Sequence, residues 1–291
     1  MVANEYTNNS QTSTFQEQTY EPEIIKEIES KRRDLHGWQW WLVAGIAISA
    51  SIFHLYTALH GLLPAMFQRS IHWMFMGVLL FLLYPASPKR PKNKIDVWDW
   101  GFAILVVIGC LNILINWDAI SDREGMPTAS DIYLGLIMIM LVIEGARRSM
   151  GWPLPIVALA AIFYALFGPY FPGLLAHGGF PFKELVPFEY LRTDGIFGVP
   201  MGVSASFIFL FVLFGAFLSS SGAGKFFIDL AVALTGQSQG GPGKAAVVAS
   251  GLMGTVSGSS VANAVTTGAF TIPLMKESGY KSEFTGAVVA A

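Results

Sequence analysis

The sequence predicts an all-α polytopic membrane protein, with transmembrane helices and one re-entrant helical hairpin. Hydrophobic residues make up 53% of the 291 residues and charged residues only 13%, whereas about 25% of an average soluble domain is charged. Six apolar stretches are long enough to cross a bilayer as helices, which takes about 20 residues each. A further apolar stretch, residues 244–276, is interrupted by glycine, serine and asparagine and predicts the hairpin.

The first 36 residues are polar and lack the early apolar core of a cleavable signal peptide. Residues 1–20 are rich in Asn, Gln, Ser and Thr, a composition that predicts disorder. Residues 22–34 predict a short amphipathic helix. We therefore expect 1–36 to be a disordered cytoplasmic tail that carries this helix.

The single cysteine, Cys110, lies in an apolar run, which excludes a disulfide framework and a cysteine metal site.

The predicted spans follow one another with short connections. Tryptophans stand at the ends of several, as is typical of side chains at headgroup level. Residues 173–198 predict an extramembrane loop with an amphipathic piece at 182–192, and 225–235 predicts an amphipathic helix along the cytoplasmic interface. The six spans are expected at 38–59, 62–84, 98–117, 131–146, 152–171 and 199–218.

Lysine and arginine are distributed unevenly between the connections, and this sets the orientation. The loops on one side of the first four spans hold only Arg69 and Arg123. The other side holds Lys26, Lys31, Arg32, Arg33, Lys89, Arg90, Lys92, Lys94, Arg147 and Arg148. The N-terminus is therefore expected in the cytoplasm.

The basic run 89–94 determines topology in this position, so no nucleic-acid partner is expected. Glu144 is expected to pair with the two arginines that follow it.

The interrupted stretch has lysine at both ends, Lys244 and Lys276, and both are expected on the cytoplasmic side. The 13 residues from Lys244 to Ser257 reach about 20 Å as a helix, and the 16 from Ser260 to Lys276 about 24 Å. Neither arm crosses a hydrocarbon core about 30 Å thick with ease. The sequence therefore predicts a hairpin that turns near the bilayer midplane.

Broken helices of this kind hold substrate and coupling ions in secondary transporters. Unwound carbonyls and helix C-termini suit Na⁺, whereas the N-terminus of the returning helix suits a carboxylate. The sequence predicts Na⁺ ligands at Gly254, Thr255, Ser257 and Gly258, and substrate contacts at Ser259, Ser260, Asn263, Thr266 and Thr267. No cofactor and no other metal are expected. The open alternative is tight helix packing through glycine, with each hydroxyl satisfied locally.

A hydrolase and a non-transporting scaffold are the two alternatives to transport. A serine hydrolase is disfavoured because the G-x-S-x-G elbow is absent and Thr255-Val-Ser257 lacks the glycine of an intramembrane protease. No histidine lies near this segment in the sequence. We therefore expect no enzyme. A non-transporting scaffold or assembly subunit remains the alternative function, although a scaffold gains nothing from unwinding a buried helix.

Several stretches of the chain resemble the fused permease of TRAP transporters. In this type a small four-helix module and a large module share one polypeptide, and the branch that works with TAXI-type solute receptors is the most similar. The resemblance covers residues 37–291 and is strong over 195–291. It is carried by residues 144–155, 164–172, 214–227 and 236–280, in particular by Gly240-Gly-Pro, the turn 257–260, and 272–276 with Gly279-Tyr280.

The resemblance implies a Na⁺-driven, elevator-type importer of small organic acids such as carboxylates. It implies a bacterial or archaeal inner membrane and a periplasmic TAXI-type solute-binding receptor as partner, which largely selects the substrate. Residues 37–150 would be the small-module-like domain and 151–198 a connecting helix and periplasmic loop. Residues 199–291 would begin the large transport module. The apolar end at 283–291 predicts an N-terminal fragment of a longer permease whose second hairpin completes the ion sites.

Overall fold

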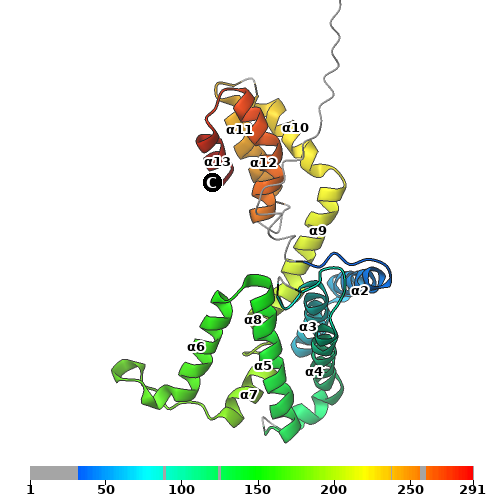
Figure 1. Cartoon of the computed structure of the whole chain (residues 1–291), viewed down its shortest axis with the longest axis vertical. Coiled ribbons are helices and arrows are strands. Elements are labelled where there is room, and N and C mark those ends of the chain that lie inside the picture. Colours follow the sequence, from blue (N-terminus) through cyan, green and yellow to red (C-terminus); the bar gives the residue numbers. More distant parts are fainter. Residues whose placement is uncertain (1–31, 88–89, 124–125, 237, 256–259, 291) are drawn as a thin grey trace, which may run out of the picture.

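A computed structural model describes residues 32–87, 90–123, 126–236, 238–255 and 260–290, and these residues are helical with no β-strand among them (Figure 1). The first half of the chain forms α2 (Trp38–His60), α3 (Ala65–Leu83), α4 (Val97–Asp122), α5 (Ala129–Met150), α6 (Pro153–Phe167) and α7 (Phe182–Leu191). The second half forms α8 (Val199–Val203), a π-helical turn (Ser204–Ile208), α9 (Phe209–Ser220), α10 (Ala223–Thr235), α11 (Gly241–Gly254), α12 (Ser260–Glu277) and α13 (Ser282–Ala290).

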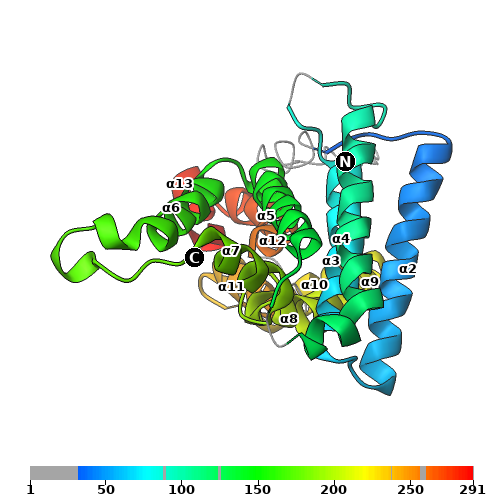
Figure 2. The same cartoon turned by 90° about the horizontal axis from the view of Figure 1, so that it is seen from below.

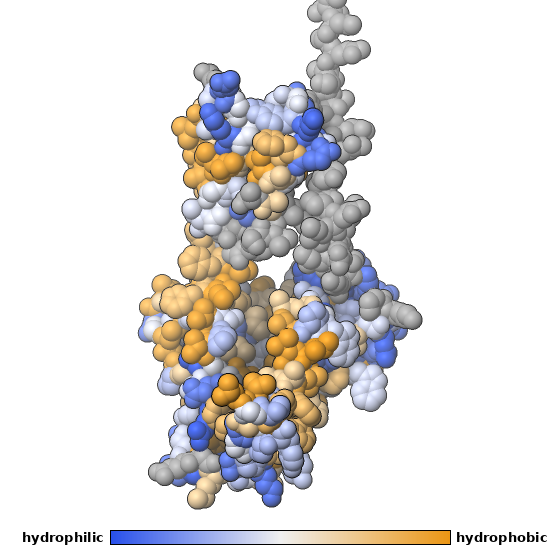
Figure 3. All heavy atoms as spheres, turned by 90° about the vertical axis from the view of Figure 1, so that its left-hand side faces the viewer, coloured by the Kyte–Doolittle hydropathy of each residue, from blue (hydrophilic) through white to orange (hydrophobic). Residues whose placement is uncertain are grey.

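The predicted class, an all-α protein with several apolar helices long enough to span a membrane, is confirmed, whereas the re-entrant hairpin stays a prediction. Six helical segments of the described chain are long and apolar enough to cross a membrane. Their bounds agree with the predicted spans: Trp38–His60, Ala65–Leu83, Val97–Asp122, Ala129–Met150, Pro153–Tyr170 and Val199–Leu218. In Figure 3 apolar side chains cover much of one face of the molecule, whereas hydrophilic ones gather toward its upper and lower ends.

The helices form two groups, which α9 connects (Figure 1). We call α2–α5 the N-terminal bundle and α10–α13 the C-terminal cluster. In Figure 2 α2, α3 and α4 lie roughly parallel, and α3 packs closely along α4. Glycine permits this approach: a Cβ atom on Gly77 would lie 2.9 Å from Cγ1 of Val106. On Gly109 of α4, a Cβ would collide with the side chain of Met138 in α5.

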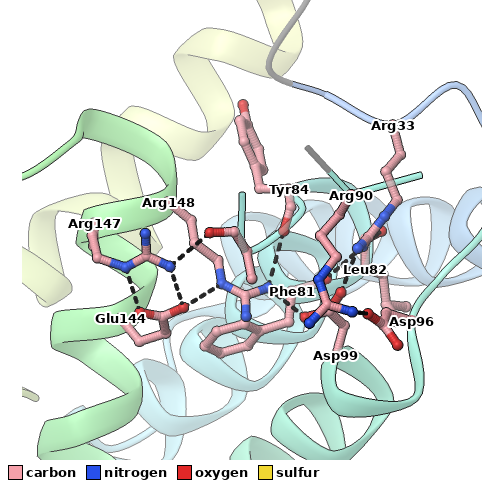
Figure 4. A network of polar contacts seen from close by, with 11 residues as sticks. Arg33, Phe81, Leu82, Tyr84, Arg90, Asp96, Asp99, Glu144, Arg147 and Arg148 are labelled. Atoms are coloured by element: carbon pink, nitrogen blue, oxygen red, sulfur yellow. Dashed lines mark hydrogen bonds and ion pairs between the residues drawn. The ribbon is translucent and has the colours of Figure 1, made fainter. Parts of the chain in front are cut away.

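One end of the N-terminal bundle is closed by a buried network of charges (Figure 4). Arg33 donates to the carbonyls of Phe81 (3.1 Å) and Leu82 (2.9 Å) at the last turn of α3, and pairs with Asp99 in the first turn of α4. Arg148 of α5 donates to the other oxygen of Asp99 at 2.6 Å. Cations thus meet the negative end of α3, and the carboxylate meets the positive end of α4. The network ties the segment before α2 to three helices.

Glu144 joins the same network from α5. Its carboxylate accepts hydrogen bonds of 2.7 Å from both Arg147 and Arg148. The predicted pairing with the two following arginines is therefore confirmed. Arg147 also donates to the Ala86 carbonyl at 2.9 Å, and the Arg148 guanidinium lies 5.0 Å from the centroid of the Phe81 ring.

A second buried polar contact fixes the π-helical turn against α2 and α3. His54 Nδ1 lies 2.7 Å from the Ala50 carbonyl, His54 Nε2 lies 2.8 Å from His72 Nδ1, and His72 Nε2 lies 3.0 Å from Ser204 Oγ. Since the carbonyl can only accept, His54 donates through Nδ1 and accepts through Nε2. His72 then donates to His54 and accepts from the Ser204 hydroxyl. Two neutral histidines satisfy this chain, which holds the start of the connecting helix to the bundle.

The loop between α6 and α8 is more ordered than a plain extramembrane loop. The predicted amphipathic piece at 182–192 forms α7, which packs against α5. Its Tyr190 is fully buried, donates to the Gly109 carbonyl of α4 at 2.6 Å and accepts from Asn112 at 3.3 Å. Burial raises the pKa of the Tyr190 hydroxyl, which therefore stays protonated and able to donate. The connection thus returns to the middle of α4.

Candidate functional site: the hairpin of α11 and α12

The two arms of the predicted hairpin are adjacent helices. α11 has 14 residues and α12 has 18, lengths of about 21 and 27 Å. They pack side by side, with the start of α11 and the end of α12 at the same end of the cluster (Figure 1). Neither belongs to the six helices suited to crossing a membrane. α11 is therefore shorter than a membrane span, whereas α12 has the length of a short one.

The interface between the arms holds a polar contact near the turn. Asn263 of α12 donates through Nδ2 to the carbonyl of Ser250 in α11 at 3.1 Å and to its hydroxyl at 3.3 Å. A carbonyl can only accept, so the amide nitrogen must face Ser250 and the amide oxygen must face away. That oxygen is buried and has no hydrogen-bond partner among the described residues. The contact leaves one unsatisfied acceptor inside the hairpin.

Gly254, the last residue of α11, lies beside the amide of Asn263. A Cβ atom on Gly254 would lie 3.5 Å from Nδ2 of Asn263, an ordinary contact distance. Farther along α12, a Cβ on Gly268 would lie 3.0 Å from Cγ1 of Val289 in α13. Gly268 therefore permits the close approach of α12 and α13, as small residues do between membrane helices generally.

The threonine hydroxyls of the site donate to carbonyls within their own helix. Thr255 donates to Leu252 at 2.6 Å and Thr267 donates to Asn263 at 2.8 Å. Thr271 repeats the pattern one turn later, donating to Thr267 at 2.8 Å. Thr267 and Thr271 are buried, whereas Thr255 is exposed. Each hydroxyl oxygen keeps acceptor capacity, so these bonds satisfy the donors and leave the oxygens able to bind a cation.

The structure brings some of the predicted site residues together and leaves others undescribed. Gly254 and Thr255 lie at the end of α11, and Asn263 and Thr267 lie one turn apart on α12. Ser260 and Thr266 belong to α12, but their side chains lie outside the described part of the chain, as do Ser257, Gly258 and Ser259 entirely. The assignment of these nine residues to ion and substrate stays a prediction.

Sequence reasoning missed Ser250, the residue that Asn263 contacts. The predicted turn at 257–260 would place Asn263 opposite Gly254, so the contact with Ser250 was not available from the sequence. Thr271 was missed as well, although it stands at i+8 from Asn263 on the same helical face.

The hairpin carries no formal charge between its flanking lysines, Lys244 and Lys276. Within the described residues no three His, Cys, Asp or Glu side chains lie close enough to hold a metal ion. What the hairpin offers is a set of neutral oxygens from amide, hydroxyl and backbone groups. Neutral oxygens suit a hard cation such as Na⁺ better than a transition metal.

Residues 137–291 match the family described as "Tripartite ATP-independent periplasmic transporter, DctM component". The chain belongs to this family. The matched residues run from within α5 to the end of the chain and include the whole hairpin. Members of the TRAP permease family are transporters and not enzymes, which agrees with the prediction that the chain is not a hydrolase.

Three relatives illustrate the match. The chain is 39% identical over 79 residues to the C4-dicarboxylate TRAP transporter large permease protein DctM of Rhodobacter capsulatus, covering 27% of this chain and 18% of that one. It is 38% identical over 79 residues to the protein of the same name from Vibrio cholerae, covering 27% and 17%. The 2,3-diketo-L-gulonate TRAP transporter large permease protein YiaN of Escherichia coli is 32% identical over 81 residues, covering 28% and 19%. No solved structure matches.

The matched part of the chain thus corresponds to less than a fifth of the length of each of these relatives. Residues before 137, which include α2, α3 and α4, lie outside the family match. The expectations of a fused small module and of a TAXI-type partner therefore stay predictions.

Proposed function

We propose that the protein is the permease component of a secondary active importer of small organic acids, driven by Na⁺ and served by an extracytoplasmic solute receptor. The observation that carries this proposal is the α11–α12 hairpin. α11 is shorter than a membrane span, the stretch between Lys244 and Lys276 is uncharged and offers neutral oxygens, and both arms lie in the part of the chain that matches the permease family.

The ion would bind where α11 ends. The last carbonyls of a helix carry partial negative charge, and Gly254 and Thr255 supply them here with the Thr255 hydroxyl. Ser257 and Gly258 would complete the shell. The unsatisfied oxygen of Asn263 is a further acceptor in the same hairpin. A bound Na⁺ would satisfy several such oxygens at once, which water cannot do at the midplane of a bilayer.

The substrate would bind on the returning arm. The first amides of α12 carry partial positive charge and attract a carboxylate, and Ser259, Ser260, Thr266 and Thr267 would add hydroxyl contacts. The amide nitrogen of Asn263 is occupied by Ser250, so Asn263 contributes to this site chiefly by holding the arms together. The printed names of the relatives, C4-dicarboxylate and 2,3-diketo-L-gulonate permeases, support an organic acid as substrate.

The receptor, the orientation and the mechanism that we propose follow from the resemblance to fused TRAP permeases. A TAXI-type receptor would deliver the substrate from the periplasmic side of an inner membrane, with the N-terminus in the cytoplasm. Residues 37–150 would brace the scaffold, and the cluster that α9 carries would move relative to it in an elevator motion. No helix of α10–α13 packs extensively against α2–α5 in the described residues, which supports independent motion of the two groups.

An uptake assay tests the function. The natural protein is reconstituted into liposomes with its periplasmic receptor and a radiolabelled C4-dicarboxylate, without ATP. The expected result is accumulation that requires the receptor and an inward Na⁺ gradient and that collapses when the gradient is dissipated. Accumulation that ignores both Na⁺ and H⁺ gradients would contradict secondary transport. If no condition gave uptake while the protein still bound its receptor, the scaffold alternative would stand.

A further inference from the structure

The connection between α6 and α7 exposes large apolar side chains although it has a defined conformation. We call residues 168–181 the aromatic loop. Leu174 is fully exposed, Tyr170 is 84% exposed and Leu175 is 57% exposed. In both Figure 1 and Figure 2 the loop projects away from the rest of the molecule, so no described element covers it.

Part of the backbone of the aromatic loop is hydrogen-bonded within the loop or to α6. Five of its N–H groups donate to carbonyls of the loop itself or of α6: Phe171 to Gly168, Leu175 to Pro172, Ala176 to Gly173, His177 to Gly168 and Phe180 to Ala165. Turn bonds of this kind also occur in loops that face water, but they lower the cost of placing the loop in lipid. In an apolar environment each unsatisfied group costs several kcal/mol. The bonding pattern therefore suits a loop that leaves water.

Side chains clasp the loop against the end of α6. The Tyr164 hydroxyl donates to the Leu175 carbonyl at 2.8 Å, and the His177 ring lies 3.1 Å from the Tyr164 carbonyl. The same imidazole fills the space that a side chain at Gly168 would need. The Tyr164 ring also packs edge-on against Phe171, with their centroids 5.0 Å apart. The clasp folds the loop back along the helix instead of letting it extend outward.

This fold places the loop at the depth of the membrane span. The helical segment suited to crossing the membrane ends at Tyr170. The Phe180 amide bonds to the carbonyl of Ala165, which lies five residues before that end, or about 7–10 Å deeper along the helix. If α6 crosses the bilayer, the part of the loop that ends at Phe180 lies at the same depth as the last turns of α6. The sequence agrees, because residues 149–182 contain no Asp, Glu, Lys or Arg.

We infer that the aromatic loop is an interfacial membrane anchor, embedded at the boundary between headgroups and acyl chains of the outer leaflet. Lipid is favoured over a protein as its occupant for two reasons: the loop continues a membrane span, and it lacks charges that would form the polar rim of a protein interface. Aromatic side chains are typical of this boundary. Tyr170, Leu174, Leu175 and Phe180 contact lipid, and the anchor fixes the point from which α7 returns to the bundle.

Fluorescence from two single labels tests the anchor. Leu174→Cys and, as a matched control, Asp194→Cys are labelled with an environment-sensitive dye in the protein reconstituted into phospholipid bilayers. Both positions are exposed in the protein, so neither substitution removes an internal contact. The native Cys110 is buried and stays unlabelled. The readout requires no transport, so its failure is separate from any failure of the proposed function.

The label at 174 is expected to emit at shorter wavelength than the label at 194. It should be quenched by lipids that carry a quencher just below the headgroup and protected from aqueous iodide, whereas the label at 194 shows the reverse. Equal iodide quenching at the two positions would overturn the inference. Protection at 174 that appears only after an extracytoplasmic receptor protein is added would also overturn it, since the loop would then be a protein-docking surface.

Discussion

The N-terminal bundle and the C-terminal cluster are both all-helical, yet they are held together by different kinds of contact. In the bundle, Arg33, Asp99 and Arg148 form buried ion pairs that join α4, α5 and the segment before α2, and Arg33 also donates to carbonyls of α3. In the described part of the cluster no ion pair is present, and its buried positions are largely alanine and glycine, such as Ala231, Ala245 and Ala249. The helices of the bundle are thus held together by buried ion pairs, whereas those of the cluster are held together by close packing of small side chains.

The difference has a physical consequence. A buried ion pair with fixed hydrogen bonds has one favourable geometry, because removing or displacing one partner leaves an uncompensated charge. Smooth surfaces of small residues allow close approach with few directional bonds. In the cluster the directional bonds are mostly within single helices, such as Thr267 to Asn263 and Thr271 to Thr267. The bundle is therefore built to keep one shape, whereas the contacts between helices of the cluster impose no single geometry.

The largest expected effect lies in the bundle. Asp99→Asn leaves two buried arginines without their carboxylate, and breaking a buried pair typically costs about 3–5 kcal/mol. The thermal unfolding midpoint of the purified protein in detergent should fall sharply. The matched control is Asp96→Asn, whose partner Arg90 is half exposed and whose pairing is worth about 0–1 kcal/mol. Equal effects of the two substitutions would show that the buried network does not hold the bundle.

The next effect concerns function in the cluster. Gly258→Val places a β-branched side chain in the turn, which lies outside the described residues, and should abolish uptake while the protein still reaches the membrane in normal amounts. Gly251→Ala is the control, since a Cβ there meets no atom within 4 Å and alanine favours a helix. The measurement is gradient-driven uptake at equal protein abundance. Normal uptake by the Gly258 variant would leave the turn with a packing role only.

A smaller effect is expected at the contact between the arms. Asn263→Ala removes the bond to Ser250 and the unsatisfied acceptor. A loss of about 1.4 kcal/mol would raise the Na⁺ concentration for half-maximal uptake about tenfold. Ser278→Ala is the control, since it removes an exposed hydroxyl that donates only to the Leu274 carbonyl and leaves the arm contact intact. If the Asn263 variant changed only the thermal midpoint and not the Na⁺ dependence, Asn263 would be structural.

The local sequence pattern sufficed to predict the spans and the short helices at 182–191 and 223–235. The spans follow from the length of each apolar stretch, and the short helices follow from their amphipathic period. The pairing of Glu144 with Arg147 and Arg148 was also accessible, since helical neighbours at i+3 and i+4 face each other. These features depend on residues close together in the chain.

Contacts between residues far apart in the chain could not be predicted from the sequence. Arg33 and Asp99 are 66 residues apart, and the partner of His72, Ser204, is 132 residues away. A buried charge in a sequence indicates that a partner exists, but its identity depends on how helices are arranged. The candidate site was located by its broken pattern, whereas the orientation of Asn263 toward Ser250 required the structure.

The smallest expected effect tests how firmly α7 belongs to the bundle. Tyr190→Phe removes only the hydroxyl that donates to Gly109 and accepts from Asn112, while the ring keeps its packing. A single hydrogen bond of this kind contributes about 1 kcal/mol net, so the thermal midpoint should fall slightly and amide exchange in 182–191 should become faster.

Tyr170→Phe is the matched control, because its ring is 84% exposed, and it should change neither measurement. If Tyr190→Phe left amide exchange in α7 unchanged, packing against Gly135 and its neighbours in α5 would hold α7 by itself. The bundle would then end at α5, and the contrast with the cluster would depend on the ion pairs alone. If exchange became faster, the hydrogen bonds from α7 to α4 would extend the fixed part of the molecule to the end of this loop.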